Sequence, residues 1–316
     1  MKIYLKKRFF KFLFFFLLSV IILELTFTNY HSDIVEIKAI HVVRNIEYLL
    51  NISRPKYDVN CNLLFEANSD EIEKAHKILA IQRNRSKVVV PGSGVTVIEV
   101  ISDQNFIFNS SMCSSYKSLF NKMNVTKDEI DFPLAYAIIT YRHAEQIHRL
   151  LNILYRPQNF YCIHVDNKSS IEYRQAINSI ASCLGNVVVA HKSESMKWNG
   201  DSILQANLNC LEDLYKMSSK WKYLLTMTGD EFPLKTNYEL VKILKVYNGT
   251  NEVEITDTFH DRYQMKGPPP HNYTIRKGSI SAVLNREFVG HVLTSKNVQD
   301  LIKWSKGMHL PDEMYI

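Results

Sequence analysis

The chain has 316 residues, 46% hydrophobic and 22% charged, a composition that excludes wholesale disorder, collagen and multi-span membrane proteins. Its length is enough for one large or two modest domains with a buried core. The net charge is +6, but residues 1–11 carry five of these charges, so the class of nucleic-acid-binding proteins with a basic folded body is disfavoured.

A basic and then apolar segment opens the chain. Residues 12–23 are uncharged and lie between Lys11 and Glu24. This run is shorter than the roughly 20 residues of a standard membrane span, but snorkelling of Lys11 extends it to residues 9–28. A cleaved signal peptide and an uncleaved signal-anchor both stay open, and the lack of a small-residue cleavage site favours the anchor. The basic flank predicts a cytosolic tail at residues 1–8 and a lumenal body.

Two further features agree with a lumenal body. Seven Asn-x-Ser/Thr sequons begin at Asn51, Asn84, Asn109, Asn124, Asn167, Asn248 and Asn272. Five cysteines are present, at Cys61, Cys113, Cys162, Cys183 and Cys210. Cysteines pair in an oxidising lumen, but five cannot pair completely, and buried hydrophobic thiols are the alternative.

The first part of the lumenal body shows few regular elements. Residues 29–68 lack firm periodicity and are interpreted as a stem. Ser69 opens a short helix, whose apolar face holds Ile72, Ala75, Ile78 and Leu79. Residues 88–98 predict two short strands about a Pro-Gly turn.

From residue 132 onward, apolar strands alternate with amphipathic helices. Strands are predicted at residues 134–140, 160–165, 187–190 and 223–227, and helices at 147–154, 170–183, 204–214 and 238–246. This alternation indicates an α/β fold with a mainly parallel sheet that helices cover on both faces. Ligands bind beyond the carboxyl ends of such strands, which here precede Tyr141-Arg-His143, Asp166-Asn-Lys168, His191-Lys-Ser193 and Gly229-Asp-Glu231.

Acidic residues at these strand ends are candidates for chemistry. Asp166 could accept hydrogen bonds from the ribose hydroxyls or a base N–H of a nucleotide, and an N-cap for the next helix is the equal alternative. Asp230 and Glu231 could hold a divalent cation, but no Asp-x-Asp motif occurs, and a hydrogen-bonding or helix-entry role is favoured. The sequence has no dinucleotide, P-loop or serine-hydrolase motif.

Longer stretches of sequence are more specific than these single positions. They include Phe132-Pro-Leu-Ala-Tyr-Ala-Ile-Ile, Arg156-Pro-Gln-Asn-Phe-Tyr-Cys-Ile-His-Val-Asp-Asn-Lys-Ser169, Asp230-Glu-Phe-Pro-Leu-Lys-Thr-Asn237 and Pro311-Asp-Glu-Met314. In these stretches, and in order over residues 113–316, the chain resembles the core 2 β-1,6-N-acetylglucosaminyltransferase family. The resemblance implies a GT-A-type catalytic domain at residues 113–316, preceded by a stem at 29–112 and a signal-anchor transmembrane segment at 9–28.

The resemblance also implies an activity and a location. Members of the family transfer N-acetylglucosamine from UDP-N-acetylglucosamine to the 6-hydroxyl of a galactose or N-acetylgalactosamine in an O-glycan, with inversion at the anomeric carbon. They need no metal or other cofactor, because basic side chains offset the diphosphate charge of the leaving UDP. The expected partners are the donor, a glycoprotein acceptor and the Golgi membrane, which a single-pass type II protein spans with its catalytic domain in the lumen. No nucleic acid is expected.

Individual residues acquire roles through the same resemblance. Glu313 corresponds to the catalytic base, which takes the proton of the acceptor hydroxyl as that oxygen attacks the anomeric carbon. Donor-binding roles fall on Ile139, Tyr141, Asp166 and Trp198, and acceptor-binding roles on Glu254 and Arg262. The implied disulfides are Cys113–Cys183 and Cys162–Cys210.

The chain departs from the family pattern in several places. Tyr141 stands where a histidine is usual, Thr228 where a cysteine is usual and Glu231 where an aspartate is usual. The family's diphosphate-neutralising basic residues and the partner of Cys61 belong to a C-terminal portion that follows Glu313, so we expect a fragment or a short isoform. Two alternatives therefore stay open: a membrane-anchored glycan-binding or scaffold protein without catalysis, and a related transferase with another donor, such as a xylosyltransferase.

Overall fold

A computed structural model describes residues 59–83, 101–120, 124–197, 200–255 and 267–308, together with Pro311, Met314 and Tyr315. The predicted cytosolic tail, the signal-anchor at residues 9–28 and the strand pair at 88–98 lie outside these residues. Within the described part of the chain, no helix is both long enough and apolar enough to cross a bilayer.

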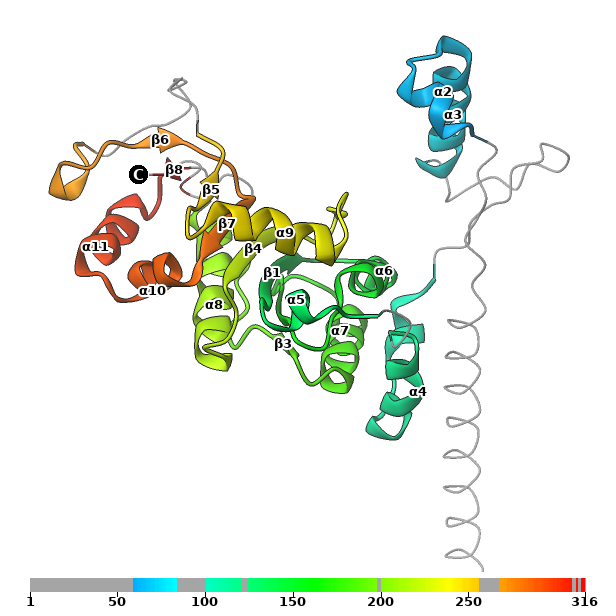
Figure 1. The fold of residues 1–316 in the computed structure, drawn as a ribbon, viewed down its shortest axis with the longest axis horizontal. Coiled ribbons are helices and arrows are strands. Elements are labelled where there is room, and N and C mark those ends of the chain that lie inside the picture. The colour runs from blue at the N-terminus through cyan, green and yellow to red at the C-terminus, as the bar shows by residue number, and fades with distance from the viewer. Residues whose placement is uncertain are drawn as a thin grey trace, which may run out of the picture.

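Six strands form one sheet in the order β3-β2-β1-β4-β7-β5 (Figure 1). They are β1 Leu134–Thr140, β2 Phe160–Val165, β3 Val187–Val189, β4 Tyr223–Thr228, β5 Glu252–Val253 and β7 Ala282–Asn285. The first four strands run parallel, whereas β7 pairs antiparallel with β4 and with β5. The prediction of an α/β fold with a mainly parallel sheet is confirmed. A separate two-stranded sheet pairs β6, Arg276–Lys277, with β8, Met314–Tyr315.

The described helices occupy the connections that the sequence pattern predicts, and several more. They are α2 Cys61–Phe65, α3 Ser69–Arg83, α4 Cys113–Ser118, α5 Lys127–Ile130, α6 Ala144–Leu154, α7 Ile171–Cys183, α8 Asp201–Met217, α9 Asn237–Tyr247, α10 Arg286–Thr294 and α11 Lys296–Ser305. Short 3-10 helices are η1 Asp103–Phe106, η2 Ser110–Met112 and η3 Pro270–Asn272.

Alternate residues of the central strands pack into two separate cores. On one face, Tyr136 and Ile138 of β1 pack with Ile163 of β2 against α6 and α7. On the other face, Ala137 and Cys162 pack against leucines of α8 and residues of α10. Figure 1 shows α8 on one side of these strands and α6 and α7 on the other. The small side chains of β1 on the α8 face let that helix approach the sheet closely.

Part of the predicted stem contributes to the first of these cores. Ile101, Phe106 and Phe108 are buried there with residues of α6 and α7. The segment also caps α6, because Oδ1 of Asp103 accepts a hydrogen bond from the N–H of Ala144 at 2.8 Å. His143, the N-cap residue, has a left-handed φ of 64° and makes no side-chain cap of its own. The helix therefore takes its capping carboxylate from a distant segment.

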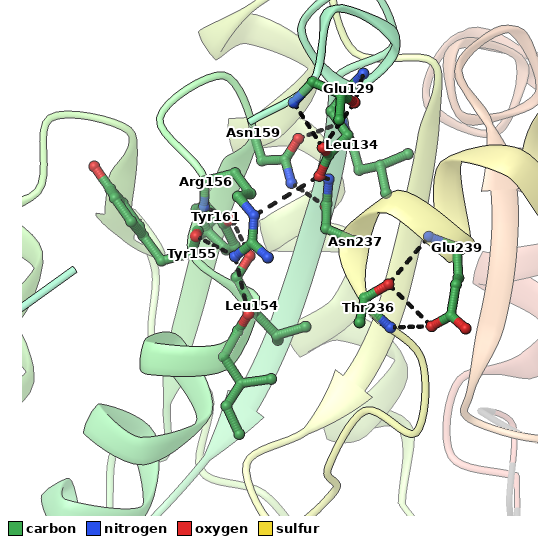
Figure 2. Close-up of polar contacts among 12 residues, drawn as sticks. Glu129, Leu134, Leu154, Tyr155, Arg156, Asn159, Tyr161, Thr236, Asn237 and Glu239 are labelled. Carbon is green, nitrogen blue, oxygen red and sulfur yellow. Dashed lines mark hydrogen bonds and ion pairs between the residues drawn. The ribbon is translucent and has the colours of Figure 1, made fainter. Parts of the chain in front are cut away.

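A buried polar network ties α5 and α9 to the amino-terminal ends of β1 and β2 (Figure 2). The side chain of Asn159 accepts from the N–H of Leu134 at 2.9 Å and donates to Oδ1 of Asn237 at 2.8 Å. Asn237 in turn donates to Oε1 of Glu129 at 2.7 Å, and that oxygen lies 3.8 Å from Nε of Arg156. Since Leu134 begins β1, this network fixes the sheet edge opposite the carboxyl ends of the parallel strands.

Two disulfides cross-link the domain. Cys113 in α4 is bonded to Cys183 in α7, and Cys162 in β2 is bonded to Cys210 in α8. These are the pairs expected from the family resemblance. The second bond joins the sheet to the helix that covers one of its faces.

Candidate functional site

The carboxyl ends of β1, β2 and β4 meet at one edge of the sheet. Pairing continues past the strands there, because the N–H of Asp166 donates to the carbonyl of Thr140 at 3.0 Å. On the other side of β1, the N–H of Gly229 donates to the carbonyl of Ile139 at 2.8 Å. The segment after β3 lies here too, because the N–H of Ala190 donates to the carbonyl of Ile163 at 3.0 Å and the N–H of Asn167 donates to the carbonyl of Glu194 at 2.9 Å. The structure thus brings together all four segments that the sequence pattern places at strand ends.

Asp166 lies at the centre of this edge and is only 6% exposed. Its Oδ1 accepts hydrogen bonds from the backbone N–H groups of Lys168, at 2.9 Å, and Met196, at 3.3 Å. Its Oδ2 lies 3.7 Å from Nζ of Lys168, whose side chain is 60% exposed. One carboxylate oxygen is therefore fixed by the backbone, while the other can accept a hydrogen bond from a ligand N–H or O–H.

The alternative interpretation of Asp166 as a helix N-cap is wrong. Helix α7 begins with Ser170 as its N-cap, and Oγ of Ser170 accepts from the N–H of Tyr173 at 3.1 Å. Asp166 instead hydrogen-bonds to the backbone two residues on, as aspartates do in tight turns. Its carboxylate is thereby directed along the sheet edge rather than into a helix.

Two other predicted donor-binding residues lie in β1 and directly after it, on the strand that pairs with β2. Ile139 of β1 is buried and pairs in register with His164 of β2. Tyr141 follows β1 and is 42% exposed, and the guanidinium carbon of Arg142 lies 4.8 Å from the centroid of its ring. The hydroxyl of Ser169 donates to the carbonyl of Tyr141 at 2.8 Å and so ties the two loops together. An exposed aromatic side chain and an accepting carboxylate on two hydrogen-bonded loops suit a planar heterocycle with an N–H.

Glu231, after β4, has the hydrogen-bonding role that the sequence analysis favours. Its Oε2 accepts from the N–H of Thr228 at 3.2 Å, and its Oε1 accepts from the hydroxyl of Ser281 at 3.0 Å. These bonds hold the end of β4 to the segment that enters β7. In the described part of the chain, no group of three or more His, Cys, Asp or Glu side chains is arranged to hold a metal ion.

A largely apolar cavity of about 520 Å³ lies on the α8 face of the sheet, between α8, α10 and α11. Its walls include Leu211, Leu284 and Leu301, and Pro311 also lines it. Two buried polar atoms in its walls, Oδ1 of Asn207 and Nε1 of Trp304, have no hydrogen-bond partner within the described residues.

Of the remaining predicted site residues, the structure describes only one. Glu254 is exposed and follows β5. Trp198, Arg262 and Glu313 lie outside the described residues, so their roles stay predictions. Sequence reasoning missed His164, a buried histidine of β2 that contacts the segment around Glu194. A histidine inside an otherwise apolar strand, two residues before Asp166, is the signal that could have found it.

Comparisons with known proteins give a consistent result. Residues 134–316 match the model of the Core-2/I-branching enzyme family. A Homo sapiens protein named beta-1,3-galactosyl-O-glycosyl-glycoprotein beta-1,6-N-acetylglucosaminyltransferase is 35% identical, over 86% of this chain and 65% of its own length. A Mus musculus protein of the same name, numbered 3, is 36% identical over 68% of this chain and 54% of its own.

A virus encodes a similar protein. The Bovine herpesvirus 4 (strain DN-599) protein with the same name as the human one is 34% identical over 82% of this chain and 60% of its own length. The chain thus spans between about half and two thirds of the length of these relatives.

Proposed function

The chain belongs to the Core-2/I-branching enzyme family, and from this we propose that it transfers N-acetylglucosamine from UDP-N-acetylglucosamine to the 6-hydroxyl of a galactose or N-acetylgalactosamine in O-glycans. The product is a β-1,6 branch. The names of the relatives support this reaction. The observation that carries the donor half of the proposal is Asp166, buried at the carboxyl edge of β2 with one oxygen fixed and the other available.

Donor recognition is assigned to the edge formed by β1 and β2. Oδ2 of Asp166 accepts a hydrogen bond from the single ring N–H of uracil or from a ribose hydroxyl. The exposed ring of Tyr141 packs on the base, and Ile139 forms the apolar floor between these residues. The family resemblance adds Trp198 to the donor site and Glu254 and Arg262 to the acceptor site.

The chemistry proposed is a single displacement. The carboxylate of Glu313 takes the proton of the acceptor 6-hydroxyl while that oxygen attacks the anomeric carbon of the donor sugar. The new C–O bond forms as the bond to the β-phosphate oxygen breaks, and UDP leaves with the electron pair. Attack from the opposite face converts the α linkage of the donor into a β linkage. The resemblance implies that basic side chains, rather than a metal ion, offset the charge on UDP.

The test measures UDP release by the complete protein, including the C-terminal portion expected after Glu313, with UDP-N-acetylglucosamine and a Galβ1-3GalNAc acceptor in EDTA, and with a Glu313→Gln control. We expect transfer in EDTA, undiminished relative to manganese, and loss of transfer in the control. Transfer that needs manganese would overturn the metal-independent mechanism. UDP binding without transfer would favour the glycan-binding or scaffold alternative, and a preference for UDP-xylose would favour the xylosyltransferase alternative.

We further propose that the protein is a single-pass type II Golgi membrane protein, anchored by residues 9–28, with its catalytic domain in the lumen. The seven sequons and the two disulfides support a lumenal body. Protease protection in sealed microsomes tests this topology. A protected, endoglycosidase-sensitive body supports it, whereas digestion without detergent contradicts it.

A further inference from the structure

His164 is completely buried in β2, two residues before Asp166 and on the same face of the sheet. Its Nε2 accepts a hydrogen bond from the backbone N–H of Glu194 at 2.9 Å. Because Nε2 is the acceptor, the ring proton is on Nδ1, which has no hydrogen-bond partner within the described residues. Burial lowers the pKa of His164, against the opposing charges of Glu194 and Asp166, so the ring stays neutral.

The segment that His164 contacts, residues 192–196, returns to the carboxyl edge of β1 and β2. The carbonyl of Glu194 accepts from the N–H of Asn167 at 2.9 Å, and the N–H of Met196 donates to Oδ1 of Asp166 at 3.3 Å. Lys168 adds a third hydrogen bond between the two segments, because its ammonium donates to the carbonyl of Met196. Residues 192–196 therefore supply one of the two backbone N–H groups that fix the orientation of the Asp166 carboxylate.

Helix α8 holds the same segment from the other side. The buried amide of Asn209 donates to the carbonyl of Lys192 at 3.2 Å and to Oε1 of Glu194 at 2.9 Å. Gln205, one turn earlier, donates to Oδ1 of Asn209 at 3.0 Å and so orients that amide. Although burial opposes ionisation, hydrogen bonds from Lys192 and Asn209 lower the pKa of Glu194. The segment is thus clamped between two buried polar side chains, one from β2 and one from α8.

We propose that His164 and Asn209 are positioning residues for donor recognition. By clamping residues 192–196 they keep the Met196 N–H on Oδ1 of Asp166, which leaves Oδ2 aimed at the nucleotide. Neither residue touches substrate in this proposal. It rests on the proposed function in one respect, namely that Asp166 binds the uridine part of the donor.

The matched variants are His164→Leu and His164→Gln in the complete protein, with the C-terminal portion expected after Glu313. Leucine keeps much of the side-chain volume but removes the acceptor, whereas the amide oxygen of glutamine reaches the place of Nε2. A buried N–H left without its acceptor costs about 1–3 kcal/mol. We therefore expect His164→Leu to raise the dissociation constant of UDP and the donor KM about tenfold, with kcat and the acceptor KM nearly unchanged. His164→Gln should restore most of the donor affinity, and Asn209→Leu should behave like His164→Leu.

The control is Ile163→Val, which trims the neighbouring residue of β2 on the opposite face of the sheet. This substitution should lower the free energy of unfolding without changing the contacts of residues 192–196, so the UDP affinity of the variant should equal that of the wild type. The proposal is overturned if His164→Leu binds UDP like the wild type, if His164→Gln is as weak as His164→Leu, or if Ile163→Val loses the same affinity.

Hydrogen exchange separates this proposal from the proposed function. Without any ligand, His164→Leu should speed exchange in residues 192–197 relative to the wild type and to Ile163→Val. Unchanged exchange there overturns the clamp itself. If the wild-type chain does not bind UDP at all, the proposed function fails and the donor role of the clamp fails with it, while faster exchange in His164→Leu still supports the anchoring by His164.

Discussion

Gly229 packs so closely against Thr140 that a Cβ atom added to the glycine would lie 2.7 Å from Oγ1 of the threonine. A change of the Thr140 rotamer would break a hydrogen bond, because its Oγ1 lies 2.6 Å from the hydroxyl of Tyr173. On the same side, Cδ1 of Ile147 would lie 2.8 Å from the added atom. The close approach holds the end of β4 against the end of β1, beside Asp166.

Gly229→Ala should therefore lower the free energy of unfolding by about 1–3 kcal/mol, the usual cost of overpacking, and also weaken UDP binding. Urea unfolding and calorimetry check the two effects. Gly185→Ala is the matched control, because a Cβ there meets no atom within 4 Å. A Gly229→Ala protein as stable as Gly185→Ala would contradict the close contact.

His148 predicts a stability that depends on pH. Burial, helped by the charge of Arg149, lowers the pKa of His148 to about 4 from an ordinary value of 6.5. The neutral ring fits its partners, since Nε2 accepts from the amide of Asn152 at 2.9 Å and Nδ1 lies 2.9 Å from the hydroxyl of Tyr116. Well above pH 6.5 the residue is neutral in both the folded and the unfolded state, so it adds no pH dependence there.

As the pH falls through 6.5 toward 4, His148 becomes protonated in the unfolded state but stays neutral in the folded state. The free energy of unfolding should then fall by up to about 3 kcal/mol through this residue. Urea midpoints measured between pH 7 and pH 4.5 check the slope. His148→Phe should reduce the slope, whereas a substitution at the exposed His291, such as His291→Gln, should leave it as in the wild type. Equal slopes for all three proteins would show that His148 is not the group responsible.

The polar network at the opposite edge of the sheet should govern stability but not donor binding. Asn159→Ala leaves the N–H of Leu134 and the side chain of Asn237 without their buried partner, which should cost about 2–4 kcal/mol. Thr236→Ala removes only the exposed capping box with Glu239 on the same helix, α9, and should cost about 1 kcal/mol. Urea unfolding ranks the two losses. UDP affinity, measured where both variants are folded, should stay at the wild-type value, and a selective loss in Asn159→Ala would argue against a purely structural role.

Substitutions at the two proposed functional carboxylates should separate binding from chemistry. Glu313→Gln removes a general base and should slow transfer by about 10²–10⁴-fold while leaving the dissociation constant of UDP unchanged. Asp166→Asn weakens the acceptor for the nucleotide and should raise the donor KM, with a smaller effect on kcat. Steady-state kinetics and calorimetry distinguish the patterns. Normal transfer by Glu313→Gln would remove that residue from the mechanism.

The four parallel strands could be predicted from sequence to within one residue, whereas helices α6 and α8 each begin three residues earlier than predicted. Strands β1 and β2 are runs of six or seven mostly apolar residues, buried almost throughout, and such runs are typical of parallel strands covered on both faces. Strands β5 and β7 have two and four residues and are only partly buried, so they are too short to show a period. The pairing that extends the sheet beyond β4 is visible only in the structure.

The residues of the candidate site also fall into those that the sequence could predict and those that it could not. Asp166 could be singled out because ligands bind past the carboxyl ends of parallel strands. His164 could be noticed as a histidine inside an apolar strand, but its role could not be predicted, because its partner is a backbone N–H 30 residues away. The same holds for Asp103, which caps α6 from 41 residues upstream. Contacts between side chains and a distant backbone depend on the completed fold rather than on any local pattern.

The bond between Cys162 and Cys210 joins the strand that carries His164 and Asp166 to the helix that carries Asn209. Both cysteines are completely shielded from solvent. Thiol exchange needs access to the sulfur atoms, so oxidoreductases must make or correct this link before the helix closes over the sheet. After folding, a reductant can reach this disulfide only when the protein unfolds locally around it. We therefore expect the covalent tie between the two halves of the clamp to form before α8 packs on the sheet, and a chain that folds with Cys162 and Cys210 reduced to lack it.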